Sequence, residues 1–217
     1  SDPLGIALYG DSKNLSIHDR SYLLGVLCSV STNNPWFRSG LDFTDGALGS
    51  LSGEDMIEAF SNVLTDASIV FHMKKMVMTA IKNGPRLSAF IPVLKGVLIN
   101  KKASYSERNF AIEILLDYGD LGKRAVVDAI SNKNFSGECS THLKLTVIGK
   151  LYSEYYNPSF MSKIILDYLR GADDYAHGEL LKLDGGVEVN DIPSVLVELS
   201  NKIICGFDDG LNQNKKS

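Results

Sequence analysis

Apolar side chains recur along the chain at positions i, i+3, i+4 and i+7, which lie on one face of an α-helix. The segments that match this pattern in full are residues 23–30, 56–63, 73–80, 111–118, 148–155 and 161–168. Broader or shorter apolar faces predict further helices at 90–98, 126–130 and 196–203. Alternation typical of strands is confined to residues 4–8 and 187–189, which are too short to build a sheet. The pattern therefore predicts an all-α protein.

The predicted helices are bounded by residues that commonly begin and end helices. Ser16, Ser52 and Ser104 are each followed three positions later by a carboxylate, as in an N-terminal capping box. Asn157 precedes a proline, which is favoured at the first helical position because its missing N–H costs nothing there. Glycines that typically follow a helix C-terminus occur at positions 84, 119 and 171.

Two helical segments repeat each other at a separation of 35 residues. Apolar residues and a terminal glycine in the first segment align with the same residue classes in the second: Val77, Ala80, Ile81 and Gly84 with Ile112, Leu115, Leu116 and Gly119. A third copy is partly in register at Val147 and Leu151, and the intervening helices repeat at Leu64 and Leu98. A helix pair of this length cannot bury both of its apolar faces alone, whereas stacked pairs share one core. The repeat predicts an α-solenoid of stacked helical hairpins.

The best-defined repeat, residues 90–116, resembles HEAT or armadillo-like units. It has a proline inside one helix, Pro92, and the sequence Arg108-Asn109-Phe110-Ala111-Ile112 opening the next. Its period is shorter than the about 40–47 residues typical of those families. A tetratricopeptide array has a closer period, but its Trp and Leu-Gly positions are absent.

The N-terminal third carries a second resemblance, in the segments 2–5, 9–11, 19–24 and 34–38, which read DPLG, YGD, DRSYLL and NPWFR. These segments are similar to the region that follows the ATPase module in bacterial NACHT-type STAND NTPases. The resemblance implies a helical repeat region that senses a trigger or relays it to a nucleotide switch. The ATPase module itself is absent from this sequence.

These patterns divide the chain into three parts. We expect an N-terminal helical segment at 1–50 that packs on the repeats, HEAT-like repeats at 51–171, and a C-terminal cap helix with a mobile polar tail at 172–217.

Composition narrows the class of partner. The 217 residues carry 22 basic and 26 acidic side chains, a formal charge of −4, so no global positive field attracts a phosphate backbone, and we expect no nucleic-acid partner. No apolar run approaches the length of a bilayer span, and no signal peptide precedes the first helix. Three widely spaced cysteines, expected to be packed thiols on helices, indicate a reducing compartment. We expect a cytoplasmic protein without a membrane partner.

No motif in the chain predicts catalysis. The sequence Gly119-Asp120-Leu121-Gly122-Lys123 lacks the spacing and ending of a phosphate-binding loop. The histidines are scattered, and His142, three residues after Cys139, supplies only two potential zinc ligands. No Gly-x-Ser-x-Gly elbow is present, and the acidic pairs at 173–174 and 208–209 lie beside glycines in polar segments. We therefore predict no catalytic residue, no cofactor and no metal site.

Two aromatic clusters are candidates for binding a protein partner. Trp36, Phe37 and Arg38 combine residue types that dominate interface hot spots, although a loop that plugs back into the core has the same composition. Tyr156 lies beside the apolar stripe of its helix and is a further candidate.

The sequence thus favours a non-enzymatic helical scaffold that binds a protein or the remaining domains of a larger chain. The resemblance favours the sensor or relay fragment of a bacterial signalling or defence STAND NTPase. A free-standing HEAT-like adaptor is the alternative, and an enzyme with a site that the sequence does not reveal is the third. The sequence makes no prediction of the oligomeric state.

Overall fold

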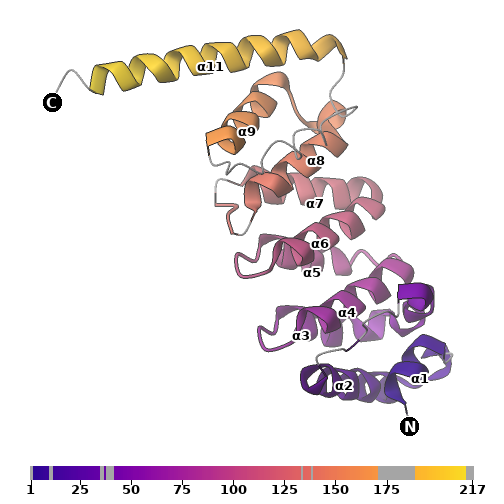
Figure 1. Ribbon diagram of the computed structural model, residues 1–217. Helices are drawn as coiled ribbons and strands as arrows, with labels where there is room; N and C mark the ends of the chain where they lie inside the picture. The colour runs from indigo at the N-terminus through magenta and orange to yellow at the C-terminus, as the bar shows by residue number, and fades with distance from the viewer. Residues whose placement is uncertain are drawn as a thin grey trace. The chain divides into compact units, whose positions relative to one another are not determined.

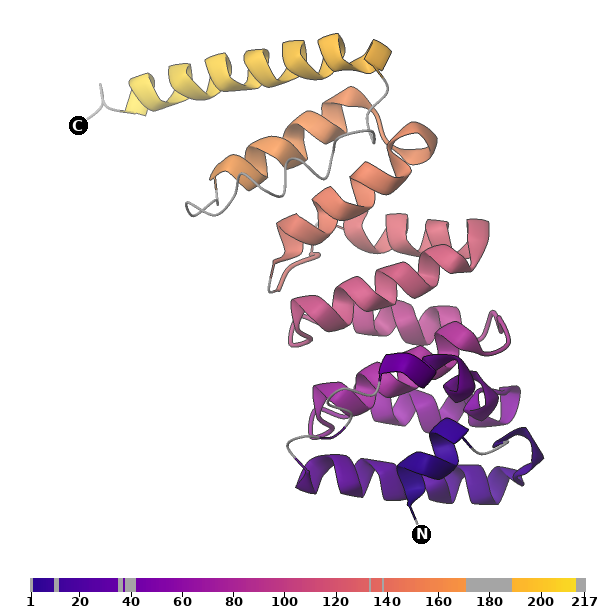
Figure 2. The ribbon, with the colours of Figure 1, turned by 45° about the vertical axis from the view of Figure 1, so that its right-hand side comes forward.

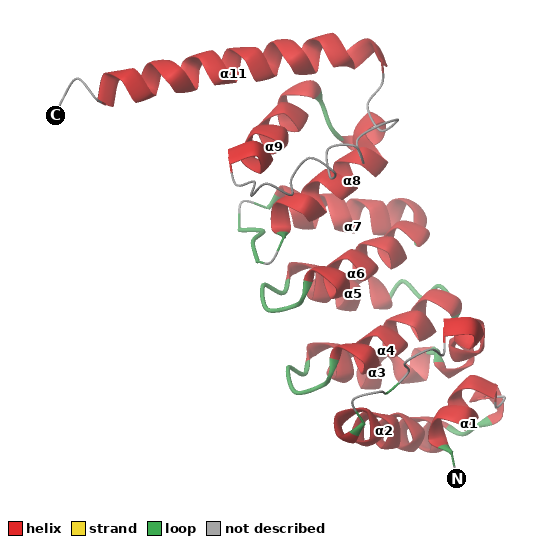
Figure 3. Ribbon diagram, viewed as in Figure 1, coloured by secondary structure: helices red, strands yellow, loops and turns green. Residues whose placement is uncertain are grey.

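The computed structural model describes residues 2–9, 12–34, 37, 42–132, 134–137, 139–170 and 189–213. These residues form helices and connecting turns without a strand, which confirms the all-α class (Figure 3). The chain divides into two compact units, residues 1–138 and 139–217. Gly171 and the polar tail from residue 214 onward lie outside the described residues, and the three-part division stays a prediction.

Unit 1 holds the helices from α1 to α7. Their bounds are α1 (Pro3–Tyr9), α2 (Ile17–Asn33), α3 (Ile57–Thr65), α4 (Phe71–Asn83), α5 (Phe90–Ile99), α6 (Tyr105–Asp117) and α7 (Gly119–Ser131). Short 3-10 segments lie at Ser12–Asn14, Asp42–Leu51 and Glu54–Met56. The strand-like alternation at 4–8 forms α1 instead, because Asp2 Oδ1 accepts the Leu4 N–H (3.1 Å) at its N-terminus.

Most predicted helix ends are confirmed. The Ser16 hydroxyl accepts the Asp19 N–H (3.2 Å), and Asn157 Oδ1 accepts the Phe160 N–H (2.9 Å). Ser104 and Glu107 form a complete capping box, with the Ser104 N–H donating to Glu107 Oε2 at 2.7 Å.

The predicted cap at Ser52 is wrong. The first turn in this region begins at Glu54, and its N-terminal residue is Gly53. Ser52 is buried against the backbone of Gly84, the residue that ends α4, and its hydroxyl makes no hydrogen bond to a described residue. The tertiary contact with Gly84 therefore takes this side chain away from the helix end.

The helices of unit 1 contact one another in a regular order (Figures 1 and 2). Alternate helices lie side by side: α3 contacts α5 and α5 contacts α7, while α2 contacts α4 and α4 contacts α6. Consecutive helices cross between these two rows, as α5 and α6 do. Alternate helices therefore contact one another along unit 1, and the consecutive pairs α3 with α4, α5 with α6 and α6 with α7 contact each other as well.

Aromatic packing joins α3 to α5. The rings of Phe60 in α3 and Phe90 in α5 stack with their centroids 6.0 Å apart, and both are fully buried. Gly119, at a φ of +64°, allows the chain to turn from α6 directly into α7.

Ion pairs join helices that are equivalent in the repeat. Lys74 Nζ of α4 lies 3.7 Å from Glu107 of α6, and Lys82 of α4 lies 3.9 Å from Glu113 of α6. Lys95 of α5 pairs with Asp128 of α7 in the same way, whereas Arg20 of α2 pairs with Asp55 in the 3-10 segment that precedes α3. The partners of these pairs are 31 to 35 residues apart in sequence, close to the 35-residue separation read from the apolar pattern.

Arg108, near the start of α6, is fully buried and connects three segments. Its Nε donates to the carbonyl oxygen of Leu98 in α5 (2.9 Å), and its guanidinium lies 4.5 Å from the centre of the Phe135 ring, which follows α7. A buried guanidinium is tolerated only where hydrogen bonds and ring contacts replace water. Arg108 therefore holds α5, α6 and the segment after α7 in one arrangement.

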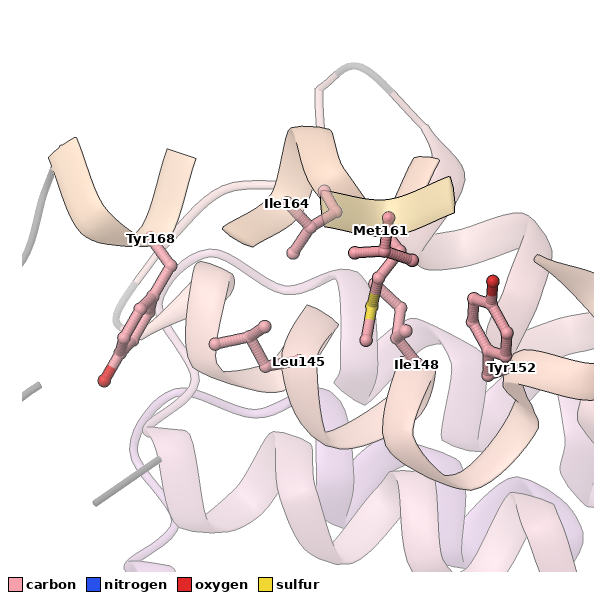
Figure 4. Packing of buried hydrophobic residues seen from close by; sticks show 7 residues of the cluster. Leu145, Ile148, Tyr152, Met161, Ile164 and Tyr168 are labelled. Carbon is pink, nitrogen blue, oxygen red and sulfur yellow. The ribbon is translucent and has the colours of Figure 1, made fainter. Parts of the chain in front are cut away.

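In unit 2 the structure describes α8 (Ser140–Tyr155), α9 (Pro158–Arg170), a 3-10 turn (Val189–Asp191) and α11 (Ile192–Gln213). Its core is an apolar cluster between α8 and α9 (Figure 4), with Leu145, Ile148 and Tyr152 on one side and Met161, Ile164 and Tyr168 on the other. Val195 of α11 completes the cluster, and the Ser162 hydroxyl donates to the Val195 carbonyl (3.1 Å). The start of α11 is thereby fixed on α9.

Replacing Arg108 with Ala is expected to lower the free energy of unfolding by about 3 kcal/mol, because it removes a charged hydrogen bond and leaves the Leu98 carbonyl buried without that donor. Arg124→Ala, at an exposed position of α7, is the matched control and is expected to change it by less than about 0.5 kcal/mol. Urea unfolding followed by circular dichroism measures both. Equal effects of the two substitutions would show that Arg108 does not join these segments.

Substitution of Ser104 and of Ser52 tests which of the two serines caps a helix. Ser104→Ala is expected to lower the free energy of unfolding by about 1 kcal/mol, because the N-terminal amides of α6 lose their acceptor. Ser52→Ala is expected to be neutral or slightly stabilising, since a buried hydroxyl without a hydrogen bond is removed. Urea unfolding measures both variants. A larger loss of unfolding free energy for Ser52→Ala than for Ser104→Ala would contradict the assignment of Ser104, and not Ser52, as a helix cap.

Candidate functional site

The structure places one residue of the Trp36-Phe37-Arg38 cluster. Phe37 is only 2% exposed, so its side chain packs inside unit 1, and its N–H donates to the Asn34 carbonyl (3.0 Å). Trp36 and Arg38 lie outside the described residues, so their partner-binding role stays a prediction. For Phe37, the position is the one expected of a loop that packs back into the core.

Tyr156 lies at the edge of the unit 2 core, directly after α8. Its ring stacks on Phe160 of α9, with centroids 4.9 Å apart and planes 16° apart. The ring is half-buried, and it packs against the apolar cluster. Part of the Tyr156 surface remains accessible to a partner. Its role in partner binding stays a prediction.

An apolar groove lies between α1 and α2 in unit 1. Its volume is about 400 Å³. Ile6 comes from α1 and Leu15 from the turn before α2, while Leu23 and Val26 come from successive turns of α2. Leu23 is buried and forms part of the floor, whereas the rim includes Tyr22, whose residue surface is 71% exposed.

Asp19 is the charged residue in the lining of this groove. Its Oδ2 accepts a hydrogen bond from the Ser16 hydroxyl (2.6 Å), and it forms no ion pair with any residue that the structure describes. The adjacent Arg20 pairs with Asp55 instead. The groove is therefore apolar with one accessible negative charge at its rim.

A second exposed apolar surface lies on α11 in unit 2. Leu196 is 60% exposed, and Ile192, Val197 and Ile203 are also large apolar side chains in contact with solvent. Val195 and Leu199 of the same helix pack toward α9. A shallow cavity of about 500 Å³ lies where the first turns of α9 and α11 meet, and Glu198 is its charged lining residue. This helix therefore has apolar side chains on its covered side and on an uncovered one.

The described cysteines differ in environment. Cys28 is half-buried in α2, where burial and, to a lesser extent, the charge of Asp66 raise the pKa of its thiol, so the thiolate is disfavoured. Cys139 is exposed at the start of α8 with a φ of +49°, so the expectation of a packed thiol is wrong there. This left-handed turn leads the chain into α8 and turns the thiol outward.

His142 is the histidine nearest to a cysteine in the sequence. His142 lies edge-on against Tyr168, with ring centroids 5.1 Å apart. In the described ranges, no group of three or more His, Cys, Asp or Glu side chains has the geometry to hold a metal ion. Nor does that part of the chain contain a helix with the length and apolar character needed to cross a bilayer.

The apolar pattern did not reveal the groove, although a signal for it exists. The apolar pattern at i, i+3, i+4 and i+7 predicts one buried face of α2. That face contains Leu23 and Leu27, both confirmed as buried. Leu23 and Val26, which line the groove, belong to that face, whereas Tyr22, which also lines it, lies beside the face. A helix with apolar residues beyond its core face indicates a second contact surface.

The arrangement of the described residues offers surfaces for docking, because accessible apolar side chains gather on α1 and α2 and on α11. Comparisons with protein-family models, with curated proteins and with solved structures found no match to this chain.

Proposed function

We propose that this chain is an α-solenoid scaffold that binds a protein partner through accessible apolar surfaces. The observation that carries the proposal is the row of side-by-side alternate helices in unit 1, joined by ion pairs between residues 33 positions apart, close to the 35-residue separation of the sequence repeat. Stacked helical hairpins of this kind bury a continuous core and leave an extended surface on which partners dock.

The exposed apolar surfaces of α1, α2 and α11 support the proposal that the chain binds a partner. Folded proteins rarely leave clusters of large apolar side chains accessible to water without a use for them. The groove of α1 and α2 and the uncovered side of α11 each present such a cluster. Each surface also carries few charges, and the cores of protein interfaces are depleted in charge.

We further propose that the scaffold is the sensor or relay region of a larger STAND-type NTPase and does not itself hydrolyse ATP. The support for this is the resemblance of residues 2–60 to the region after the ATPase module in NACHT-type proteins. A solenoid flexes by small motions at each repeat, so a partner bound along it biases a nucleotide switch in the same molecule. The coupling is then a difference in partner affinity between the two states of the switch.

Photo-crosslinking in the source cell tests the scaffold role. A benzoylphenylalanine residue replaces Tyr22 in one variant and Leu196 in another, and Leu121, which is 61% exposed on α7 outside both surfaces, is the matched control position. We expect discrete crosslinked proteins at Tyr22 or Leu196 and not at Leu121. The purified crosslinked protein is expected to bind the chain with a Kd below about 10 µM. Absence of crosslinks above the control at both positions would contradict the scaffold.

Peptide mapping of the native product tests the relay role separately. Mass spectrometry of the protein isolated from its source cell is expected to show peptides upstream of Ser1 that contain a Gly-x-x-x-x-Gly-Lys-Ser/Thr loop. Such a loop cradles nucleotide phosphates, so its presence in the same chain would supply the switch. A native product that spans only residues 2–217 would reject the relay role and favour a free-standing adaptor.

A further inference from the structure

We propose that the groove between α1 and α2 binds an amphipathic helix of a protein partner, with a Lys or Arg of that helix pairing with Asp19. This inference rests on the proposed scaffold function and names the class of partner. The groove combines a buried apolar floor at Leu23, an accessible aromatic rim at Tyr22 and, among the lining residues that the structure describes, a single negative charge at Asp19.

The dimensions of the groove fit side chains presented by a helix. The lining residues of α2 run from Asp19 to Val26, which at the rise of an α-helix covers about 10 Å, or two turns. Residues at i, i+4 and i+7 of a partner helix cover the same length, and helix-in-groove recognition uses these positions as anchors. Ile6 of α1 and Leu15 form the opposite wall, so the anchors enter between two elements of unit 1.

Charge selects a basic partner. Asp19 has the Ser16 hydroxyl as its hydrogen-bond donor and no cation among the residues that the structure describes. The nearest arginine in sequence, Arg20, pairs with Asp55. A Lys or Arg beside the anchors therefore gains a carboxylate without displacing an existing ion pair, whereas a Glu or Asp there meets a like charge.

The same charge argues against a second copy of this chain in the groove. Two grooves docked face to face would bring two Asp19 carboxylates together. The other exposed apolar surface, on α11, carries Glu198 and lies next to Asp191, and its Lys202 is already held by Glu198 (3.7 Å) and the Ser159 carbonyl (2.8 Å). Docking α11 of another copy would add carboxylates next to Asp19, so a basic helix from a different protein fits better.

The test uses two synthetic helical peptides of about 18 residues, long enough to hold a helix in water. Both carry Leu at i, i+4 and i+7, one is flanked by Lys, and its twin has Glu in place of each Lys. Fluorescence anisotropy of the labelled peptides measures binding to the full chain. We expect the Lys peptide to bind about fivefold more tightly than the Glu twin, the range of an exposed ion pair, and to weaken as salt is added.

Variants of the groove locate the binding. Tyr22→Ala is expected to weaken the Lys peptide about tenfold, because an aromatic anchor at the rim is lost. Asp19→Lys is expected to reverse the preference in favour of the Glu twin, and Asp19→Asn, which keeps an acceptor for Ser16, to abolish the preference. The matched controls are Leu121→Ala and Glu58→Lys, at exposed positions outside the groove, and neither is expected to change binding. Circular dichroism confirms that each variant is folded.

Three results would overturn the proposal. The first is failure of the Lys peptide to bind more tightly than its twin, and the second is binding that Tyr22→Ala and Asp19→Lys leave unchanged. The third is self-association of the chain that Tyr22→Ala abolishes, since a second copy would then occupy the groove. Photo-crosslinking distinguishes failure of the groove proposal from failure of the scaffold proposal. If partners are captured at Leu196 and not at Tyr22, the scaffold role is supported and the groove proposal is rejected.

Discussion

The buried guanidinium of Arg108 is the contact on which the arrangement of unit 1 depends most. A charge removed from water is costly, and here the Leu98 carbonyl and the Phe135 ring offset that cost. These partners come from α5 and from the segment after α7, so the cost is met only when both lie against α6. Next to it, Glu107 caps α6 and also contacts Lys74 of α4. Two adjacent residues thus couple the start of α6 to elements before and after it in the chain.

Beyond this point, the structure of unit 1 is maintained by contacts that recur with the repeat. Apolar packing such as Phe60 on Phe90 joins helices in one row, and ion pairs such as Lys95 with Asp128 follow the same row further along. Exposed ion pairs contribute little individually, about 0–1 kcal/mol. Their regular placement favours one register between neighbouring helices over a slipped one. In helical arrays built from such nearest-neighbour contacts, small motions at each helix pair add up along the array.

The accessible surfaces differ chemically from these internal contacts. Inside unit 1, charged side chains pair with each other, as Arg20 does with Asp55. At the groove, Asp19 lacks a cationic partner in the described chain and is surrounded by apolar side chains. An apolar surface with one charge provides area for affinity and a charge for selectivity, which suits recognition of a partner helix. Catalysis would need several polar groups converging on one point, a different arrangement.

The sequence by itself determined the helices and most of their ends, because periodicity and capping depend on residues close together in the chain. The Ser104 and Asn157 caps and the buried positions of α4 and α9 follow from such local patterns. Tertiary structure decided what depends on distant residues. Ser52 is not a cap because Gly84 covers it, Phe37 is buried by the rest of unit 1, and the groove exists because α1 lies beside α2. Which apolar residues stay in contact with water is a property of the packed molecule, since a helical pattern shows a second apolar side but not whether anything covers it.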